Sequence, residues 1–143
     1  MVEMSNQPGA AWLAIVTRQT IQDFASAFCG TPVLEATVLP APLIGTGAIY
    51  EFFRATRSMY DRIQFVQEMR SFTRICLEWE GQFQSREISG ATILTYGAGG
   101  AIDRIRLFHH PLEQLNAFSA ELGRQRSMKA ESNNNFNGVH HEN

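Results

Sequence analysis

The chain has 143 residues, of which 44% are hydrophobic and 18% charged, and its formal net charge at pH 7 is −2. This length and composition fit one globular domain with a sizeable core. The charge balance excludes the basic stripe with which proteins bind nucleic acid, and no segment approaches the roughly 20 apolar residues of a membrane-spanning helix. We therefore expect one domain with neither a nucleic-acid partner nor a membrane partner.

The first residues, MVEMSNQPGAAW, lack the basic start and apolar run of a secretory signal, so we expect a cytoplasmic protein. In that compartment Cys29 and Cys76 are expected to be buried thiols rather than a disulfide or a nucleophile. Residues 1–9 are expected to form a flexible leader, and residues 10–126 a single domain.

Hydrophobic residues recur at helical spacing in two segments of the first half. The segment from Ala10 to Cys29 predicts a helix, which the following Gly-Thr-Pro sequence ends. The stretch VLEATVLPAPLIG comes next, and its two internal prolines favour an edge strand or an irregular strand. Thr46 is the expected N-cap of a second helix, GAIYEFFRATRSMY.

From Asp61 onward the hydrophobic period becomes that of strands. Four strands are predicted, the last two joined by a Gly97–Gly100 turn: RIQFVQEM, SFTRICLEWEGQF, REISGATILTY and AIDRIRLFH. Pro111 begins a closing helix, which Gly123 is expected to end. Residues 127–143 are polar and rich in asparagine, so we expect a disordered tail with no fixed geometry and no metal site, in spite of its two adjacent histidines, His140 and His141.

This order of elements predicts an α+β fold, in which a curved antiparallel sheet wraps around helices and forms a cone with an internal pocket. It resembles the nuclear transport factor 2-like superfamily, with its SnoaL-like and ketosteroid-isomerase-like branches and its cystatin-like fold. The resemblance covers about residues 10–123 and rests on IGTGAIYEFF (44–53) and GAGGAIDRIRLFHHPLEQL (97–115). It implies a pocket for a small apolar molecule, used by isomerases, cyclases, epoxide hydrolases and dehydratases, or by binding and dimerisation domains.

The chain departs from the ketosteroid-isomerase branch where that branch carries a carboxylate base. Leu39 and Pro40 stand near that position, just before the glycine–helix motif. The first helix also lacks a tyrosine that could donate to an oxyanion. We therefore expect no proton transfer of the ketosteroid-isomerase kind, and the candidate acid–base groups are those of the sheet.

The predicted hairpins bring ionisable side chains together on one face of the sheet. The last hairpin is expected to pair Tyr96 with Ala101, and a hairpin closing near Gln82–Ser85 to place Glu78 opposite Gly90. One face then mixes aliphatic and ionisable residues, as a pocket wall does: Arg74, Cys76, Glu78, Glu80, Ile88, Thr92, Leu94, Asp103, Ile105, Leu107 and His109.

Glu78 is the leading candidate for a catalytic acid or base, because desolvation would raise the pKa of its carboxyl toward neutrality. His109, at the strand end, is its candidate proton partner. Arg74 and Asp103 could orient the substrate or a water molecule, as the resemblance to epoxide hydrolases implies. Structural roles remain open, since Glu78 can lie on a solvated strand face and His109 can cap the last helix. The expected pocket lining is Phe28, Phe53, Glu80, Thr92, Leu94 and Ile105.

These features predict a cofactor-independent isomerase, cyclase or hydrolase that acts on a small apolar substrate by carboxylate and histidine acid–base chemistry, without a metal. The alternative is a non-catalytic ligand-binding or dimerisation domain, with an interior filled by side chains such as Phe24, Phe28, Phe53 and Trp79. A homodimer is expected through the outer face of the sheet, where the registers place five apolar residues: Ile75, Leu77, Ile93, Ile102 and Phe108.

Overall fold

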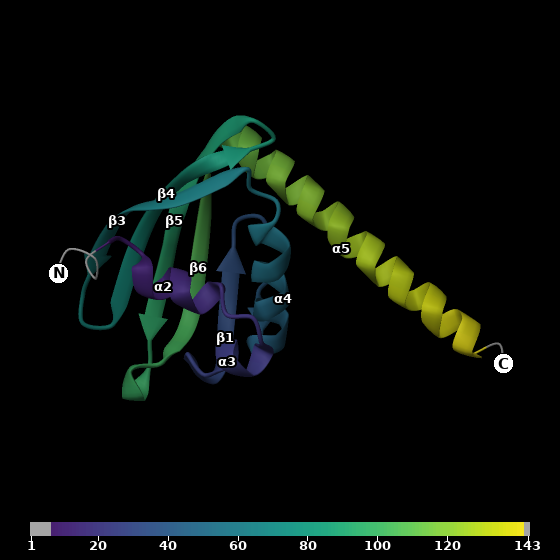
Figure 1. The fold of residues 1–143 in the computed structure, drawn as a ribbon, viewed down its shortest axis with the longest axis horizontal. Helices are drawn as coiled ribbons and strands as arrows, with labels where there is room; N and C mark the ends of the chain where they lie inside the picture. The colour runs from purple at the N-terminus through teal and green to yellow at the C-terminus, as the bar shows by residue number, and fades with distance from the viewer. Residues whose placement is uncertain (1–6, 142–143) are drawn as a thin grey trace.

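The structure is a computed structural model that describes residues 7–141, and the surroundings of side chains for residues 7–130. One six-stranded sheet, in the order β2-β1-β6-β5-β4-β3, curves around the helices without closing (Figure 1). Neighbouring strands are antiparallel except β1 and β6, which run parallel. The predicted α+β class is confirmed, with a mixed sheet in place of a purely antiparallel one.

The strands are β1 (Phe28–Ala36), β2 (Leu43–Ile44), β3 (Arg62–Arg70), β4 (Arg74–Phe83), β5 (Arg86–Tyr96) and β6 (Ile102–His110). The helices are α2 (Ala10–Val16), α3 (Ile21–Ala25), α4 (Thr46–Arg57) and α5 (Leu112–His141), with a short 3-10 turn, η1 (Ala98–Gly100). Strands β3 to β6 lie within a few residues of the four predicted ones, because their period-two pattern is a local property of the sequence.

The first predicted helix is broken in two. Helix α3 begins after Thr20, whose hydroxyl accepts the backbone N–H of Asp23. Farther on, Phe28 is already in β1 and pairs with Ile102 of β6. The single helix expected over residues 10–29 is therefore wrong, because a side-chain cap restarts the helix and the sheet takes up its last residues.

Helix α5 is longer than predicted. It continues through the exposed Gly123 to His141, so the expected stop at Gly123 is wrong, and the segment expected to be disordered is helical from residue 127 to 141. Arginine, glutamine, methionine, lysine and alanine follow Gly123, and their helix propensity offsets the roughly 1 kcal/mol cost of glycine. The side chains of the two adjacent histidines lie outside the described residues. Among the described helices, none has the length and apolar character that a membrane crossing requires.

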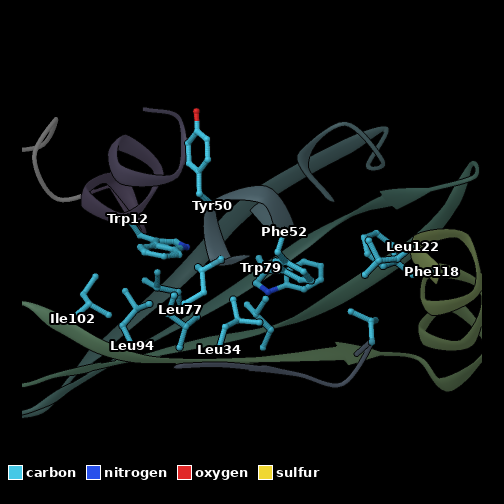
Figure 2. Close-up of a cluster of buried hydrophobic side chains, with 14 of the residues drawn as sticks. Trp12, Leu34, Tyr50, Phe52, Leu77, Trp79, Leu94, Ile102, Phe118 and Leu122 are labelled. Carbon is cyan, nitrogen blue, oxygen red and sulfur yellow. The ribbon is translucent and has the colours of Figure 1, made fainter. Parts of the chain in front are cut away.

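The core lies between the concave face of the sheet and helices α2 and α4 (Figure 2). Trp12 of α2 and Phe52 of α4 face Leu77 and Trp79 of β4 across it. At the other end, Phe118 of α5 is fully buried and closes the same core. The layer between helices and sheet is therefore the place for an internal pocket.

A one-residue difference in register decides which side chains of β4 point inward. The turn between β4 and β5 has two residues, Gln84 and Ser85, both with positive φ (52° and 66°), as in a type I′ hairpin. This turn places Trp79, rather than Glu78, opposite Gly90. The predicted register is wrong, and because successive side chains alternate, the slip moves every side chain of β4 to the other face.

The register of β5 against β6 differs from the prediction by two residues. Leu94 pairs with Ile105 rather than with Asp103. An even shift preserves the faces, so His109 still lies on the predicted concave face. An irregularity at the end of β5 turns Ile102 inward, where it is 1% exposed, and not outward as predicted.

We predict that alanine at Gly90 and at Gly123 changes stability in opposite directions. A Cβ atom at Gly90 would overlap the Phe108 carbonyl oxygen and the Trp79 indole, so Gly90→Ala should lower the free energy of unfolding by about 2 to 3 kcal/mol. At Gly123 no atom lies within 4 Å of that position, and Gly123→Ala should raise it by about 0.5 to 1 kcal/mol. Urea unfolding measures both free energies. A Gly90→Ala variant with the free energy of unfolding of the wild type would contradict the packing of Trp79 on β5.

Candidate functional site

An apolar cavity of about 90 Å³ lies between the helices and the concave face of the sheet. Its wall comes from α2, α4, the residues after α4 and strands β3 to β6. Six aromatic side chains contribute to this wall: Trp12, Phe52, Phe53, Tyr60, Phe65 and Trp79. Such a wall holds an apolar molecule by burial, and a few polar groups then orient it.

Exposed residues mark the mouth of the cavity, between α2 and β3. Leu13 of α2 is 48% exposed and Ile63 of β3 is 39% exposed, and both line the cavity. Beside them, Arg57 Nη1 donates to the backbone oxygen of Val16 at 3.1 Å and so ties the end of α4 to the end of α2. The mouth therefore carries a positive charge that the interior lacks.

His109 of β6 is part of the cavity wall and is only 8% exposed. Its ring packs against Trp79 and Phe118, with centroid distances of 5.4 and 5.5 Å. Burial among these rings lowers the pKa of His109 from 6.5 to about 4, because desolvation disfavours the charged form. The imidazole is therefore neutral at physiological pH.

The two nitrogens of the His109 ring have different surroundings. Nδ1 lies 2.8 Å from the Thr37 hydroxyl oxygen. Nε2 makes no hydrogen bond to the described residues, among which no fully buried side-chain nitrogen or oxygen lacks a partner. Nε2 is therefore not fully buried, and His109 is one of the residues that line the cavity.

Tyr60, which follows α4, also lines the cavity. Its ring lies against Trp79 and Phe118, at centroid distances of 5.7 and 4.9 Å. Burial raises the pKa of Tyr60, so the phenol stays protonated and can donate a hydrogen bond. In Figure 2 the indole nitrogens of Trp12 and Trp79 lie on the sides of their rings that face one another. The wall thus offers neutral N–H and O–H donors.

Of the four residues predicted to be catalytic, the structure places only His109 in the cavity wall. Glu78 and Arg74 are exposed on the convex face of the sheet, as the register of β4 requires, so their predicted placement in the pocket is wrong. Asp103 lies at the start of β6, beside Gly97. The described residues contain no ion pair between Arg74 and Asp103.

Two of the residues predicted to line the pocket, Phe53 and Thr92, line the cavity. Glu80 is exposed on the convex face for the same reason as its neighbours on β4. The other three are part of the surrounding core: Phe28, Leu94 and Ile105. Sequence reasoning missed Tyr60, which follows α4 in an irregular segment, because an isolated tyrosine there carries no periodic signal.

No group of three histidine, cysteine, aspartate or glutamate side chains with the geometry of a metal site occurs among the described residues. Cys29 and Cys76 are both free thiols. Within the described part of the chain, the cavity wall holds one potential metal ligand, His109, and no carboxylate. Its polar groups are suited to hydrogen bonding and proton transfer.

We predict that His109 makes stability depend on pH. Its folded pKa of about 4 lies below the unfolded value of 6.5, so the unfolded chain binds more protons between these values and stability is lost as the pH falls through this window. Urea unfolding should show a loss of about 2 kcal/mol between about pH 7.5 and about pH 5. His109→Gln should remove this dependence, whereas the same change at the exposed His110 should keep it. An unchanged pH dependence in His109→Gln would show that the imidazole is not buried.

Comparison with known proteins places the fold. No protein-family profile and no curated protein matches the chain. A steroid delta-isomerase from Pseudomonas aeruginosa matches with a TM-score of 0.75 at 16% identity, over 85% of this chain and 90% of that one. An uncharacterised protein with a cystatin-like fold from Silicibacter pomeroyi matches with a TM-score of 0.76 at 11% identity, over 92% and 94%. A ketosteroid isomerase-like protein from Catenulispora acidiphila, in complex with trimethylamine, matches with a TM-score of 0.57 at 18% identity, over 77% and 89%. The chain therefore has the cystatin-like fold, which is the fold that the resemblance found in the sequence implies.

Proposed function

We propose that this protein is a cofactor-independent enzyme, of the isomerase, cyclase or hydrolase kind, that binds a small apolar molecule in the cavity. The observation that carries the proposal is the neutral His109 imidazole, which lines an aromatic-walled cavity and whose Nε2 has no partner among the described residues. The likeness of the fold to that of a steroid delta-isomerase supports this class of enzyme. The free thiols of Cys29 and Cys76 fit the reducing cytoplasm, which we propose as its location.

The cavity volume sets the size of the part of the ligand that is enclosed. A volume of about 90 Å³ corresponds to roughly three water molecules at their share of liquid volume. A compact ring or short chain fits this space, and a longer molecule extends through the mouth between Leu13 and Ile63. The apolar lining of the mouth suits such an extension, because it continues the aromatic wall.

Acid–base chemistry in this cavity depends on neutral groups. His109 can give or take a proton at Nε2, and Tyr60 can donate a hydrogen bond to an oxygen on which negative charge develops. Glu78 lies on the opposite face of the sheet. The carboxylate predicted as the partner of His109 therefore does not reach the cavity, and the proposed chemistry uses His109 with the hydroxyl of Tyr60.

The alternative is a non-catalytic ligand-binding domain, and one observation favours it. Among the residues that the structure describes, no carboxylate lines the cavity. A binding domain needs only the apolar wall and a few donors. Turnover distinguishes this alternative from the enzyme, because binding is common to both.

The proposed function is tested by native mass spectrometry of freshly purified protein, followed by denaturing extraction and assay of the bound molecule. We expect a small apolar ligand, and a fall in its turnover of about 100-fold or more in His109→Gln. Glu78→Gln is the matched control, because it also converts an ionisable side chain to an amide but lies on the convex face. Full turnover in His109→Gln, or its loss in Glu78→Gln, would contradict the assignment. Binding without turnover by the wild type would favour the alternative.

We also propose a homodimer through the convex face of the sheet. Phe108 of β6 is 37% exposed there, near Ile93 of β5. The other three residues expected on this face, Ile75, Leu77 and Ile102, are buried in the core, which corrects the predicted interface. A second copy would cover Phe108 and Ile93, since one apolar patch can pair with itself across a two-fold axis.

We predict that Phe108→Glu converts the dimer to a monomer in sedimentation velocity, because two like charges would meet at the centre of the interface. Phe72→Glu is the matched control. Phe72 is fully exposed and lies in the turn between β3 and β4, outside the strands. A wild-type protein that sediments as a monomer would contradict the dimer. Phe108→Glu and Phe72→Glu variants that associate to the same extent would also contradict it.

A further inference from the structure

The Thr37 hydroxyl holds His109 from outside the cavity. Its oxygen accepts the backbone N–H of His109 at 3.1 Å and lies 2.8 Å from Nδ1 of the same residue. The backbone of Thr37 is itself fixed, because its N–H donates to the backbone oxygen of Leu107 at 3.0 Å. Thr37 directly follows β1, so the parallel pairing of β1 with β6 brings together two residues that are 72 positions apart in sequence.

The hydrogen-bonding capacity of these groups determines where the ring proton lies. A threonine hydroxyl has one proton and two lone pairs, and a neutral imidazole has one N–H and one acceptor nitrogen. One lone pair of Thr37 accepts the His109 backbone N–H. If Nδ1 also carried a proton, the hydroxyl would accept twice, and its own proton would have no acceptor among the described residues. With Thr37 donating to Nδ1, the hydroxyl makes both of its hydrogen bonds within the described residues, and the ring proton lies on Nε2, which is left to bond a ligand.

We propose that Thr37 is a positioning residue, which holds His109 as the Nε2–H tautomer and so makes the cavity a site for a ligand with a hydrogen-bond acceptor, such as a carbonyl oxygen. This inference rests on the proposed function, because it assigns the direction in which His109 acts. His109 then begins as a donor rather than as a base.

The other polar groups of the cavity agree with a ligand that accepts hydrogen bonds. Tyr60 is a protonated phenol, and the indole nitrogens of Trp12 and Trp79 can only donate. The cavity wall includes no carboxylate that would pair with an ammonium group, and Arg57 places a positive charge at the mouth. A small ketone, aldehyde or ester therefore fits the wall better than an amine.

The tautomer can be measured by 15N NMR of histidine-labelled protein without any ligand, because protonated and unprotonated ring nitrogens have different chemical shifts. The chain has four histidines, and His109→Gln identifies the signals of His109. At about pH 7, above the pKa of His109, we expect an unprotonated Nδ1 and a protonated Nε2. On addition of cyclopentanone, a compact ketone used as a probe, we expect the Nε2–H resonance to move.

Substitution of Thr37 tests its role. Thr37 is exposed, so Thr37→Val leaves the core filled while removing the hydroxyl. The Nε2–H population should fall from its wild-type value, because Nδ1 then loses the hydroxyl proton that keeps it an acceptor. Thr37→Ser should restore the wild-type tautomer, and Thr73→Val, at another exposed threonine, should leave it unchanged.

A wild-type ring protonated at Nδ1 would overturn the proposal, as would a tautomer that Thr37→Val does not alter. An Nε2–H resonance that cyclopentanone leaves in place would overturn the ligand class. The tautomer is read in the free protein, so its result is independent of turnover. If His109→Gln kept full turnover, the enzyme assignment would fail, but the 15N spectra could still show that Thr37 sets the tautomer. The two failures are therefore distinguishable.

Discussion

The contact between Trp79 and Gly90 is the constraint on which the rest of the structure depends. Trp79 lies opposite a residue with no side chain, and its indole occupies the space that a Cβ atom would need. That pairing sets the register of β4, sends Leu77 and Trp79 inward, and sends Glu78 to the convex face. Trp79 then contacts both His109 and Tyr60. The wall of the cavity is thus a consequence of one strand register.

The elements of the fold could be predicted from the sequence, because their signals are local. The period-two pattern and the glycine-rich turn predict β3 to β6 to within a few residues, and Pro111 predicts the start of α5. The register of β4 could not be predicted in the same way. It depends on positive φ angles at Gln84 and Ser85, and neither residue belongs to the asparagine–glycine type that marks such a turn.

The candidate site was predictable only where it did not depend on that register. The predicted face of the sheet is right for His109, because the predicted β5–β6 register differs from the observed one by an even number of residues. The predicted face is wrong for Glu78, because the predicted register of β4 differs from the observed one by one residue. Tyr60 and Thr37 lie in irregular segments, and their positions follow from tertiary contacts to Trp79 and His109. Sequence patterns do not record such contacts.

The distribution of charge explains why the proposed chemistry uses neutral groups. An unpaired carboxylate in this aromatic cavity would cost several kcal/mol of desolvation, whereas a neutral imidazole or phenol costs much less. Charged side chains lie outside the cavity, some at the mouth, as Arg57 does, and some on the convex face, as Glu35 does with Arg104. The interior can therefore orient a ligand by hydrogen bonds without burying a net charge.

The most direct test of this account is a crystal structure determined under xenon pressure, because xenon enters apolar cavities of this kind. The account predicts a xenon atom enclosed by Trp79, Thr92 and His109, with Glu78 on the convex face. A cavity closed to xenon, or a register of β4 in which Glu78 points into the interior, would contradict it.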